Sequence, residues 1–399
     1  MKKEYIKSLC MIFSLVIIAS CSNNKPYSIF GQEQGNEEYE IALQLVREFS
    51  KEQSFGLSRN KSNELVIKKV EKSSVVCVDY ITVSRSREEV NENIDIYTFT
   101  IEKNGKTGFA MATGDKRIAQ VLSFVEVGSV SDTIDIPSLA FMIRNIPTAL
   151  KRELREYYDG EPVLSRNDQN WTALSTTPFV KTTWGTGAPY NNNYDMVNCS
   201  STSNYKYQAS TTAVACAQVI IANKQRPTNF EYEICIPTWT REPKIDEKYN
   251  VYAAQAAAFI KGIDNGASVT YACERPSYAQ LINAASSITY YGYIRDQHYS
   301  YDITADYAKI ARNAKAGFGT IFGGKVTSIS ANNYYAWIVD GFQGKVNSDI
   351  TQAKMAKVHC VFCFGGRGDG WFINPFDKGA TGGSSVADGL MQFIYFNAF

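Results

Sequence analysis

The order of segments in the C-terminal half constrains the fold more than any other feature of the sequence. Apolar residues first recur at helical spacing in four segments, and four short alternating segments separated by glycine-rich turns follow them. Helices followed by an antiparallel sheet are typical of the α+β class. The predicted helices are 211–225, 251–267, 277–293 and 305–318, and the predicted strands are 319–324, 334–344, 357–364 and 370–376.

The preceding 120 residues or so predict a smaller α+β unit. Residues 37–53 have the spacing of an amphipathic helix, and residues 136–160 form another helical region. Between them lie segments rich in β-branched and aromatic residues, which predict strands at 64–86, 94–102, 109–115 and 116–130. We therefore expect a first domain at 37–160, a polar and aperiodic linker at 161–177, and a second domain at 178–399.

The N-terminus reads as a targeting signal. Lys2, Lys3 and Lys7 precede an apolar run that ends in Ile18-Ala19-Ser20-Cys21, which resembles a bacterial lipoprotein box. Residues 1–21 would then be a lipoprotein signal, with Cys21 carrying the lipid and residues 22–36 acting as a tether. This predicts a cell-envelope protein anchored at the outer membrane or the cell surface. An ordinary cleaved secretory signal, which gives a released protein, is the alternative.

Charge and cysteine content exclude several classes of function. The chain has 41 Lys+Arg against 40 Asp+Glu, which gives no support to nucleic-acid binding. Cys360 and Cys363 have metal-type spacing, but no second pair follows them, and we predict no metal and no cofactor.

The tripeptide Arg367-Gly368-Asp369 falls in a glycine-rich turn and is not interpreted as an adhesion motif. The tryptophans Trp184, Trp337 and Trp371 are expected in the core rather than on a ligand platform.

Seven motifs in a fixed order resemble the streptopain family of secreted cysteine peptidases. The resemblance implies a papain-like fold preceded by an inhibitory propeptide-like domain. The motifs are KTGFAMATGDKRIAQVLSFVEVGSV (106–130), WGTGAPYN (184–191), STTAVACAQV (210–219), ITYYGY (288–293), YAWIVDGF (335–342), HCVFCFGGRGDGWF (359–372) and GATGGSSVADG (379–389).

The same resemblance implies that the catalytic groups have been replaced. Peptidases of this type use a cysteine at a helix N-terminus, a histidine, a group that orients the histidine, and an amide that stabilises the oxyanion. In frame with the family motifs, Thr211 stands at the cysteine and Tyr335 at the histidine. Val361 and Phe362 stand at the orienting asparagine and its neighbouring tryptophan, and Thr186 stands at the glutamine.

No other residue in the sequence is placed to replace the missing catalytic cysteine or histidine. Cys216 lies five residues after Thr211, about 140° off its helix face and about 7.5 Å further along the axis. Tyr335 is protonated at neutral pH and cannot serve as the base. His359 shares the face of Val361 but is displaced by about 6.5–7 Å, and His298 has no spacing that connects it to the site. The hydroxyl residues at 210–212 serve as a helix cap instead.

These observations predict a lipid-anchored pseudopeptidase. Its partners would be a polypeptide or a related cysteine peptidase, with the lipid as its link to the membrane. The propeptide-like domain would stay joined to the second domain unless another protease cuts the linker. The alternative is an active secreted cysteine endopeptidase with a rearranged site.

Overall fold

The computed structural model describes most of the chain, and its residues divide into two compact units. The first comprises residues up to Asp135 together with Leu139–Asn170 and Gly370–Pro375. The second comprises Ile136–Ser138, Trp171–Asp369 and Phe376–Phe399. The described residues are 27–28, 36–53, 64–83, 86–158, 171–199, 202–223, 247–272, 276–281, 283–284, 295–296, 306–328, 331–374 and 392–396. Cys21, His298 and the predicted signal lie outside them.

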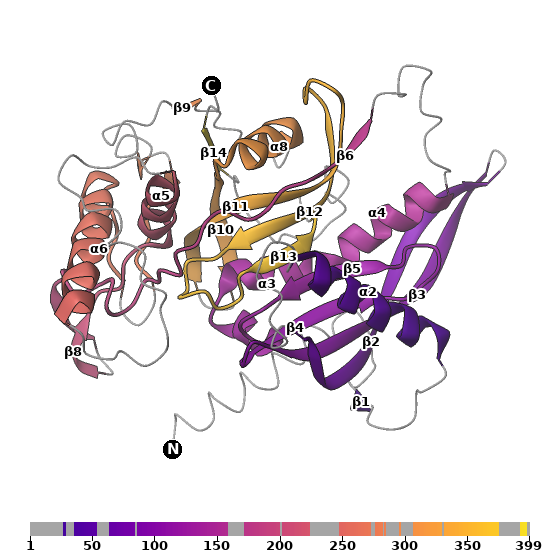
Figure 1. Cartoon of the computed structure of the whole chain (residues 1–399), viewed down its shortest axis with the longest axis horizontal. Coiled ribbons are helices and arrows are strands. Elements are labelled where there is room, and N and C mark those ends of the chain that lie inside the picture. The colour runs from indigo at the N-terminus through magenta and orange to yellow at the C-terminus, as the bar shows by residue number, and fades with distance from the viewer. Residues whose placement is uncertain are drawn as a thin grey trace. The chain divides into compact units, whose positions relative to one another are not determined.

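An antiparallel sheet forms the body of the first unit (Figure 1). Its strands run in the order β2-β3-β4-β5-β13, and β1 pairs with the outer edge of β2. The turn between β3 and β4 places Asn104 and Gly105 at φ 54° and 71°, a left-handed conformation suited to these two residue types. The bounds are β1 Tyr27–Ser28, β2 Val66–Val83, β3 Ser86–Lys103, β4 Lys106–Thr113, β5 Gln120–Val125 and β13 Gly370–Ile373.

Helix α2 (Glu37–Gln53) covers this sheet and closes the core of the first unit. Its Ala42, Val46 and Phe49 pack with Phe99 and Phe124 of the strands. The glycine-aspartate turn after β4 brings Gly114 so close to α2 that a Cβ there would lie 1.8 Å from the carbonyl oxygen of Glu38. The predicted motif at 106–130 therefore has a packing role in the first unit.

Three segments of the first unit differ from the predicted ones. Strand β3 begins at Ser86, eight residues before the strand expected over 94–102. The strand expected over 116–130 is confined to β5, because residues 116–118 form a turn and η2 (Val130–Ile134) is a 3₁₀ helix capped by Ser129. The helical region at 136–160 is two helices, α3 (Pro137–Arg144) and α4 (Ile146–Tyr158). The amphipathic helix at 37–53 is confirmed as α2.

The second unit joins helices to an antiparallel sheet of order β14-β10-β11-β12 (Figure 1). Strand β6 pairs with the C-terminal part of β11, β9 pairs with β14, and β7 and β8 form a separate hairpin. The helices are α5 Thr211–Ala222, α6 Glu247–Gly266 and α8 Tyr307–Ala316. The strands are β6 Thr172–Ser175, β7 Met196–Cys199, β8 Thr202–Lys206, β9 Arg295–Asp296, β10 Thr320–Ser328, β11 Ala331–Val346, β12 Ala353–Val361 and β14 Gln392–Phe396.

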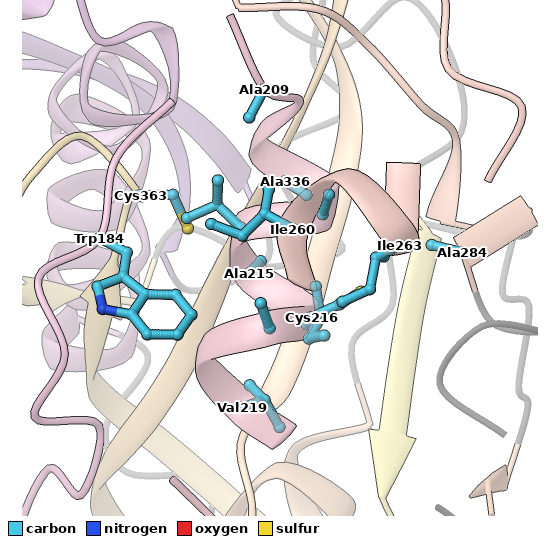
Figure 2. Packing of buried hydrophobic residues seen from close by; sticks show 14 of the residues in the cluster. Trp184, Ala209, Ala215, Cys216, Val219, Ile260, Ile263, Ala284, Ala336 and Cys363 are labelled. Carbon is cyan, nitrogen blue, oxygen red and sulfur yellow. The ribbon is translucent and has the colours of Figure 1, made fainter. Parts of the chain in front are cut away.

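Helix α5 lies at the centre of the second unit. Residues 211–221 are all buried, so this helix is enclosed on every side rather than amphipathic, and Thr211, Thr212 and Gln218 are its buried polar residues. Figure 2 shows Ala215, Cys216 and Val219 on α5, with Trp184 on one side and side chains of α6 on the other. Strand β11 packs against the same helix. The first turn of α5 therefore contacts other protein atoms and not solvent.

Three predictions in the second unit are corrected. The linker expected at 161–177 includes strand β6, and the long continuous part of the second unit begins at Trp171 rather than Pro178. The strand expected over 357–364 ends at Val361, since Cys363 has φ +67° and cannot continue it. Tyr278 pairs with Thr270 in a β-bridge, so the helix expected from residue 277 does not begin there. Among the described residues, no helix has the length and hydropathy needed to cross a bilayer.

Candidate functional site

Thr211, at the predicted nucleophile position, is the first residue of α5. Its side chain is 1 % exposed, and its Oγ1 accepts a hydrogen bond from the backbone N–H of Ala336 at 2.8 Å. Ser210 is the N-cap of the helix, and its Oγ accepts from the N–H of Ala213 at 3.0 Å. The predicted capping role of this hydroxyl segment is confirmed at Ser210. The Thr211 oxygen instead joins α5 to β11.

Tyr335, at the predicted histidine position, directly precedes Ala336 on β11. Ala336 and Ile338 belong to the apolar cluster around α5, and successive side chains of a strand point to opposite faces. The Tyr335 side chain therefore lies on the other face of β11 and is 4 % exposed. The backbone of β11, rather than a side chain at position 335, meets the start of α5.

The other three predicted positions are equally enclosed. Thr186 is 4 % exposed, and its hydroxyl donates to Oε1 of Gln208 at 3.0 Å. Val361 ends β12 opposite Ile338, and it is 3 % exposed. Phe362 is fully buried. All five predicted positions are thus packed into the interior, and Thr211 and Tyr335 are brought close together through Ala336.

A buried carboxylate that the sequence did not single out lies beneath the start of α5. Asp264 of α6 accepts hydrogen bonds from the Ser210 N–H (3.0 Å), the Ser210 hydroxyl (2.5 Å) and the Tyr194 hydroxyl (2.5 Å). Burial raises the pKa of Asp264, while the Ser210 and Tyr194 hydrogen bonds and the charge of Lys261 lower it. Three donors on one fully buried aspartate fix the first turn of α5 against α6.

Lys261 supplies the positive charge nearest to this carboxylate in the described part of α6. Its ammonium lies 4.5 Å from the ring centre of Tyr194 and 4.9 Å from that of Tyr271. It also donates to the Tyr271 hydroxyl at 2.9 Å. The cation is held between two aromatic faces, a favourable electrostatic arrangement. Lys261, Tyr194 and Asp264 therefore form one continuous polar network.

A second polar cluster lies at the end of β12. His359 Nδ1 is 2.5 Å from Oδ1 of Asp340, and the other oxygen of Asp340 accepts from the N–H of Val180 at 2.9 Å. Asp369 Oδ1 accepts from the N–H of Phe362 at 2.7 Å. Burial raises the pKa of Asp369 to about 7, and the negative charge of Asp340 adds to this rise. The Phe362 hydrogen bond and the charge of His359 oppose it.

This cluster gives the Arg367-Gly368-Asp369 tripeptide and His359 structural roles. Asp369 is bonded to Phe362 within its own turn, so the Arg367-Gly368-Asp369 tripeptide has a structural role there. His359 is on β12 as expected, but its imidazole is paired with Asp340. The cluster joins β11, β12 and the turn after β12 to each other.

Gln218 links α5 to two loops. Its Oε1 accepts from the Thr182 hydroxyl at 2.9 Å and from the Trp184 N–H at 3.0 Å, and its Nε2 lies 3.4 Å from Sγ of Cys363. Cys363 has φ +67° at a motif position where the family resemblance places glycine. A non-glycine residue in this conformation is strained, and the bond from Gln218 helps to hold it.

Three thiols of the second unit are not activated. Cys216, Cys360 and Cys363 are free and buried. Burial raises the pKa of Cys216, Cys360 and Cys363, with nearby aspartates adding to the rise. A peptidase nucleophile requires the opposite shift. No group of three His, Cys, Asp or Glu side chains is arranged for a metal in the part of the chain that the structure describes.

Structural comparison identifies the fold. No family model matches the sequence, and no curated protein matches it either. A prointerpain A fragment from Prevotella intermedia (a cysteine-to-alanine mutant) superposes with TM-score 0.50 and 13% identity, over 80% of this chain and 98% of the other. The chain has the fold of a papain-like cysteine peptidase with its propeptide. This confirms the predicted α+β, papain-like class.

The mature enzyme gives a weaker match. Active wild-type interpain A cysteine protease from Prevotella intermedia aligns with TM-score 0.39 and 15% identity, over 56% of this chain and 94% of the other. The fold conclusion therefore rests on the match to the prointerpain fragment.

Three sets of interactions in the site were not predicted from the sequence. Asp264 and Tyr194 lie 70 residues apart and meet only in the folded unit. Asp340 and His359 are partners because β11 and β12 pair, with Gly341 opposite His359. Gln218 belongs to the helix motif at 210–219, but nothing in that motif indicates which residues its amide would contact.

Proposed function

We propose that this protein is a lipid-anchored pseudopeptidase of the streptopain family that acts by binding rather than by hydrolysis. The bond between Thr211 Oγ1 and the Ala336 N–H is the observation that carries the proposal. It uses the side-chain oxygen at the nucleophile position as an acceptor for the backbone of β11. A hydroxyl also needs a strong base to become a nucleophile, and Tyr335 supplies none at neutral pH.

Burial and thiol chemistry support the same proposal. The five positions of the family's catalytic groups are all at most 4 % exposed, so a scissile peptide has no direct access to them. The three buried thiols of the second unit, Cys216, Cys360 and Cys363, have raised pKa values, opposite to a cysteine-peptidase nucleophile. The polar clusters at Asp264 and His359 hold backbone segments instead of substrate.

The partner we propose is a related cysteine peptidase, bound by the propeptide-like unit. The match to a zymogen fragment spans 80% of the chain, and the first unit has an apolar core to which Trp371 contributes. Capture of another polypeptide is the second form of the same binding hypothesis. Cys21 would place the protein in the cell envelope, at the outer membrane or the cell surface.

Catalysis is tested with purified protein. Casein turnover and labelling by a thiol-reactive peptide warhead are measured for the wild type and for the Thr211→Ala and Cys216→Ala variants. We expect no turnover and no labelling in any of them. Turnover that survives in Cys216→Ala and disappears in Thr211→Ala would establish an active endopeptidase with a rearranged site.

Binding and anchoring need separate measurements. The protein is mixed in micromolar excess with active streptopain-like peptidases, and residual activity is recorded; unchanged activity rejects the inhibitor hypothesis. The intact mass of the protein from cells reports lipidation of Cys21 and cleavage between the units at the same time. A mass without lipid at Cys21 rejects the anchor.

A further inference from the structure

The outer edge of β5 in the first unit is occupied by a strand from far along the chain. Gly370, Trp371 and Phe372 of β13 pair with Val125, Phe124 and Ser123 of β5. Residues 370–375 belong to this unit by their contacts, although residues 171–369 separate them from the rest of it. The sheet of the first unit is therefore completed by a strand that is distant from it in the sequence.

Gly370 fits this position because the neighbouring backbone is very close. A Cβ at residue 370 would lie 2.3 Å from the carbonyl oxygen of Phe124 and 3.0 Å from Cα of Val125. Those atoms are backbone and cannot rotate away as a flexible side chain would. The β5 edge therefore selects glycine at this register.

Two further contacts hold the strand. Trp371 is 3 % exposed and belongs to the apolar core of the first unit, where its ring and that of Phe49 pack in a T-shaped arrangement, 6.3 Å between centres. The guanidinium of Arg152 on α4 donates to the carbonyl oxygen of Asn374 at 3.2 Å. Buried tryptophan and arginine are residue types that often dominate the energy of a binding interface.

We propose that the β5 edge is a strand-docking surface whose occupant is Gly370–Ile373, and that it retains this strand after the chain is cut between residues 159 and 170. The N-terminal piece would then remain bound as a subunit after cleavage instead of dissociating as a propeptide. Retention of the N-terminal piece is measured by size, and it depends neither on catalysis nor on inhibition of another peptidase.

The test uses the full chain with a site-specific protease sequence inserted between residues 159 and 170. After cutting in mild detergent, size-exclusion chromatography and intact mass should show the two pieces as one 1:1 complex at micromolar concentration. Separation of the wild-type pieces at that concentration would overturn the proposal.

Variants locate the holding contact. Gly370→Ala should weaken the complex of cut pieces by about 100-fold or more, as for other buried steric clashes. Gly187→Ala is the matched control, since a Cβ there meets no heavy atom within 4 Å, and it should leave the affinity unchanged. Arg152→Ala should weaken it by about tenfold, as expected for a hydrogen bond to a charged group. Wild-type affinity in Gly370→Ala, or in Arg152→Ala where Gly370→Ala fails to fold, contradicts the proposal.

A competing peptide provides a readout that needs no variant of the protein. The peptide GDGWFINPF, which has the sequence of residues 368–376, is added in excess to the cut wild-type complex. It should accelerate exchange of the pieces, and the same peptide with alanine in place of its second glycine, the one at Gly370, should not. Equal exchange with both peptides would exclude recognition through the β5 edge.

Discussion

The hydroxyl oxygen of Thr211 lies 2.8 Å from the backbone nitrogen of Ala336 and accepts a hydrogen bond from its N–H. One residue of β11 is thereby fixed to the first turn of α5. In the papain-like arrangement these two elements carry the nucleophile and the histidine, by the resemblance of the sequence motifs. The bond keeps the elements adjacent with a neutral oxygen acceptor, so the scaffold does not require a thiolate–imidazolium pair for its stability.

Thr211→Val should destabilise the second unit by about 1–3 kcal/mol, because it leaves the buried Ala336 N–H without its acceptor. Thr211→Ser keeps the oxygen and should cost less than the valine variant. Urea unfolding followed by circular dichroism measures both free energies of unfolding. Equal values for valine and serine would mean that the hydrogen bond contributes no net stability.

Asp264→Ala should destabilise the protein by about 3 kcal/mol or more, since three buried donors lose their acceptor. Asp264→Asn retains the shape and one carbonyl oxygen, and we expect a smaller loss. Thermal unfolding compares the two midpoints. The same midpoint for both variants would argue against the Ser210 and Tyr194 hydrogen bonds as the source of the effect.

Asp369 should make stability fall as the pH rises. Its pKa in the folded protein is about 7, above its ordinary value near 3.8, so the folded state binds the proton more tightly. Its contribution is therefore fully present below about pH 4 and is lost as the pH rises through about 7.

Asp369→Asn removes this dependence and serves to measure it. Urea midpoints are determined between pH 4 and pH 8 for the wild type and the variant, and the titratable groups that do not interact with Asp369 cancel in the difference. The variant should gain relative to the wild type as the pH rises. A difference that is constant across this range would contradict the raised pKa.

Gly114→Ala should destabilise the first unit by about 2–3 kcal/mol or more, because its Cβ would meet the Glu38 carbonyl oxygen at 1.8 Å. Gly187→Ala, where the added methyl group meets open space, is the matched control and should change the urea midpoint little. If both variants unfold at the same urea concentration, the close approach of α2 to this turn is incorrect.

Local signals in the sequence predicted the start of α5 and the class of the fold. The hydroxyl residue at 210 and the alanine spacing after it fixed the frame of the helix, and Ser210 is its cap. The strand expected over 370–376 is present as β13, but its partner β5 could not be predicted. Local periodicity identifies a strand without specifying which distant strand pairs with it.

The polar partners of the site were beyond sequence reasoning for a related reason. Asp264 sits on a helix whose apolar pattern gave no cause to single out one carboxylate, and its donors come from a loop and from the cap of another helix. The bond of Thr211 is made to a backbone N–H, which every residue but proline carries. Such contacts are decided by packing, not by residue type.

The position of β13 also determines when the first unit can be completed. Val125 and Gly370 are neighbours in one sheet although about 245 residues of chain lie between them, and closing a loop of that length costs about 5 kcal/mol of chain entropy. The ribosome delivers the N-terminal residues first, yet β5 cannot pair with β13 until residues 370–373 have emerged. The N-terminal unit is first in sequence and among the last parts to finish folding.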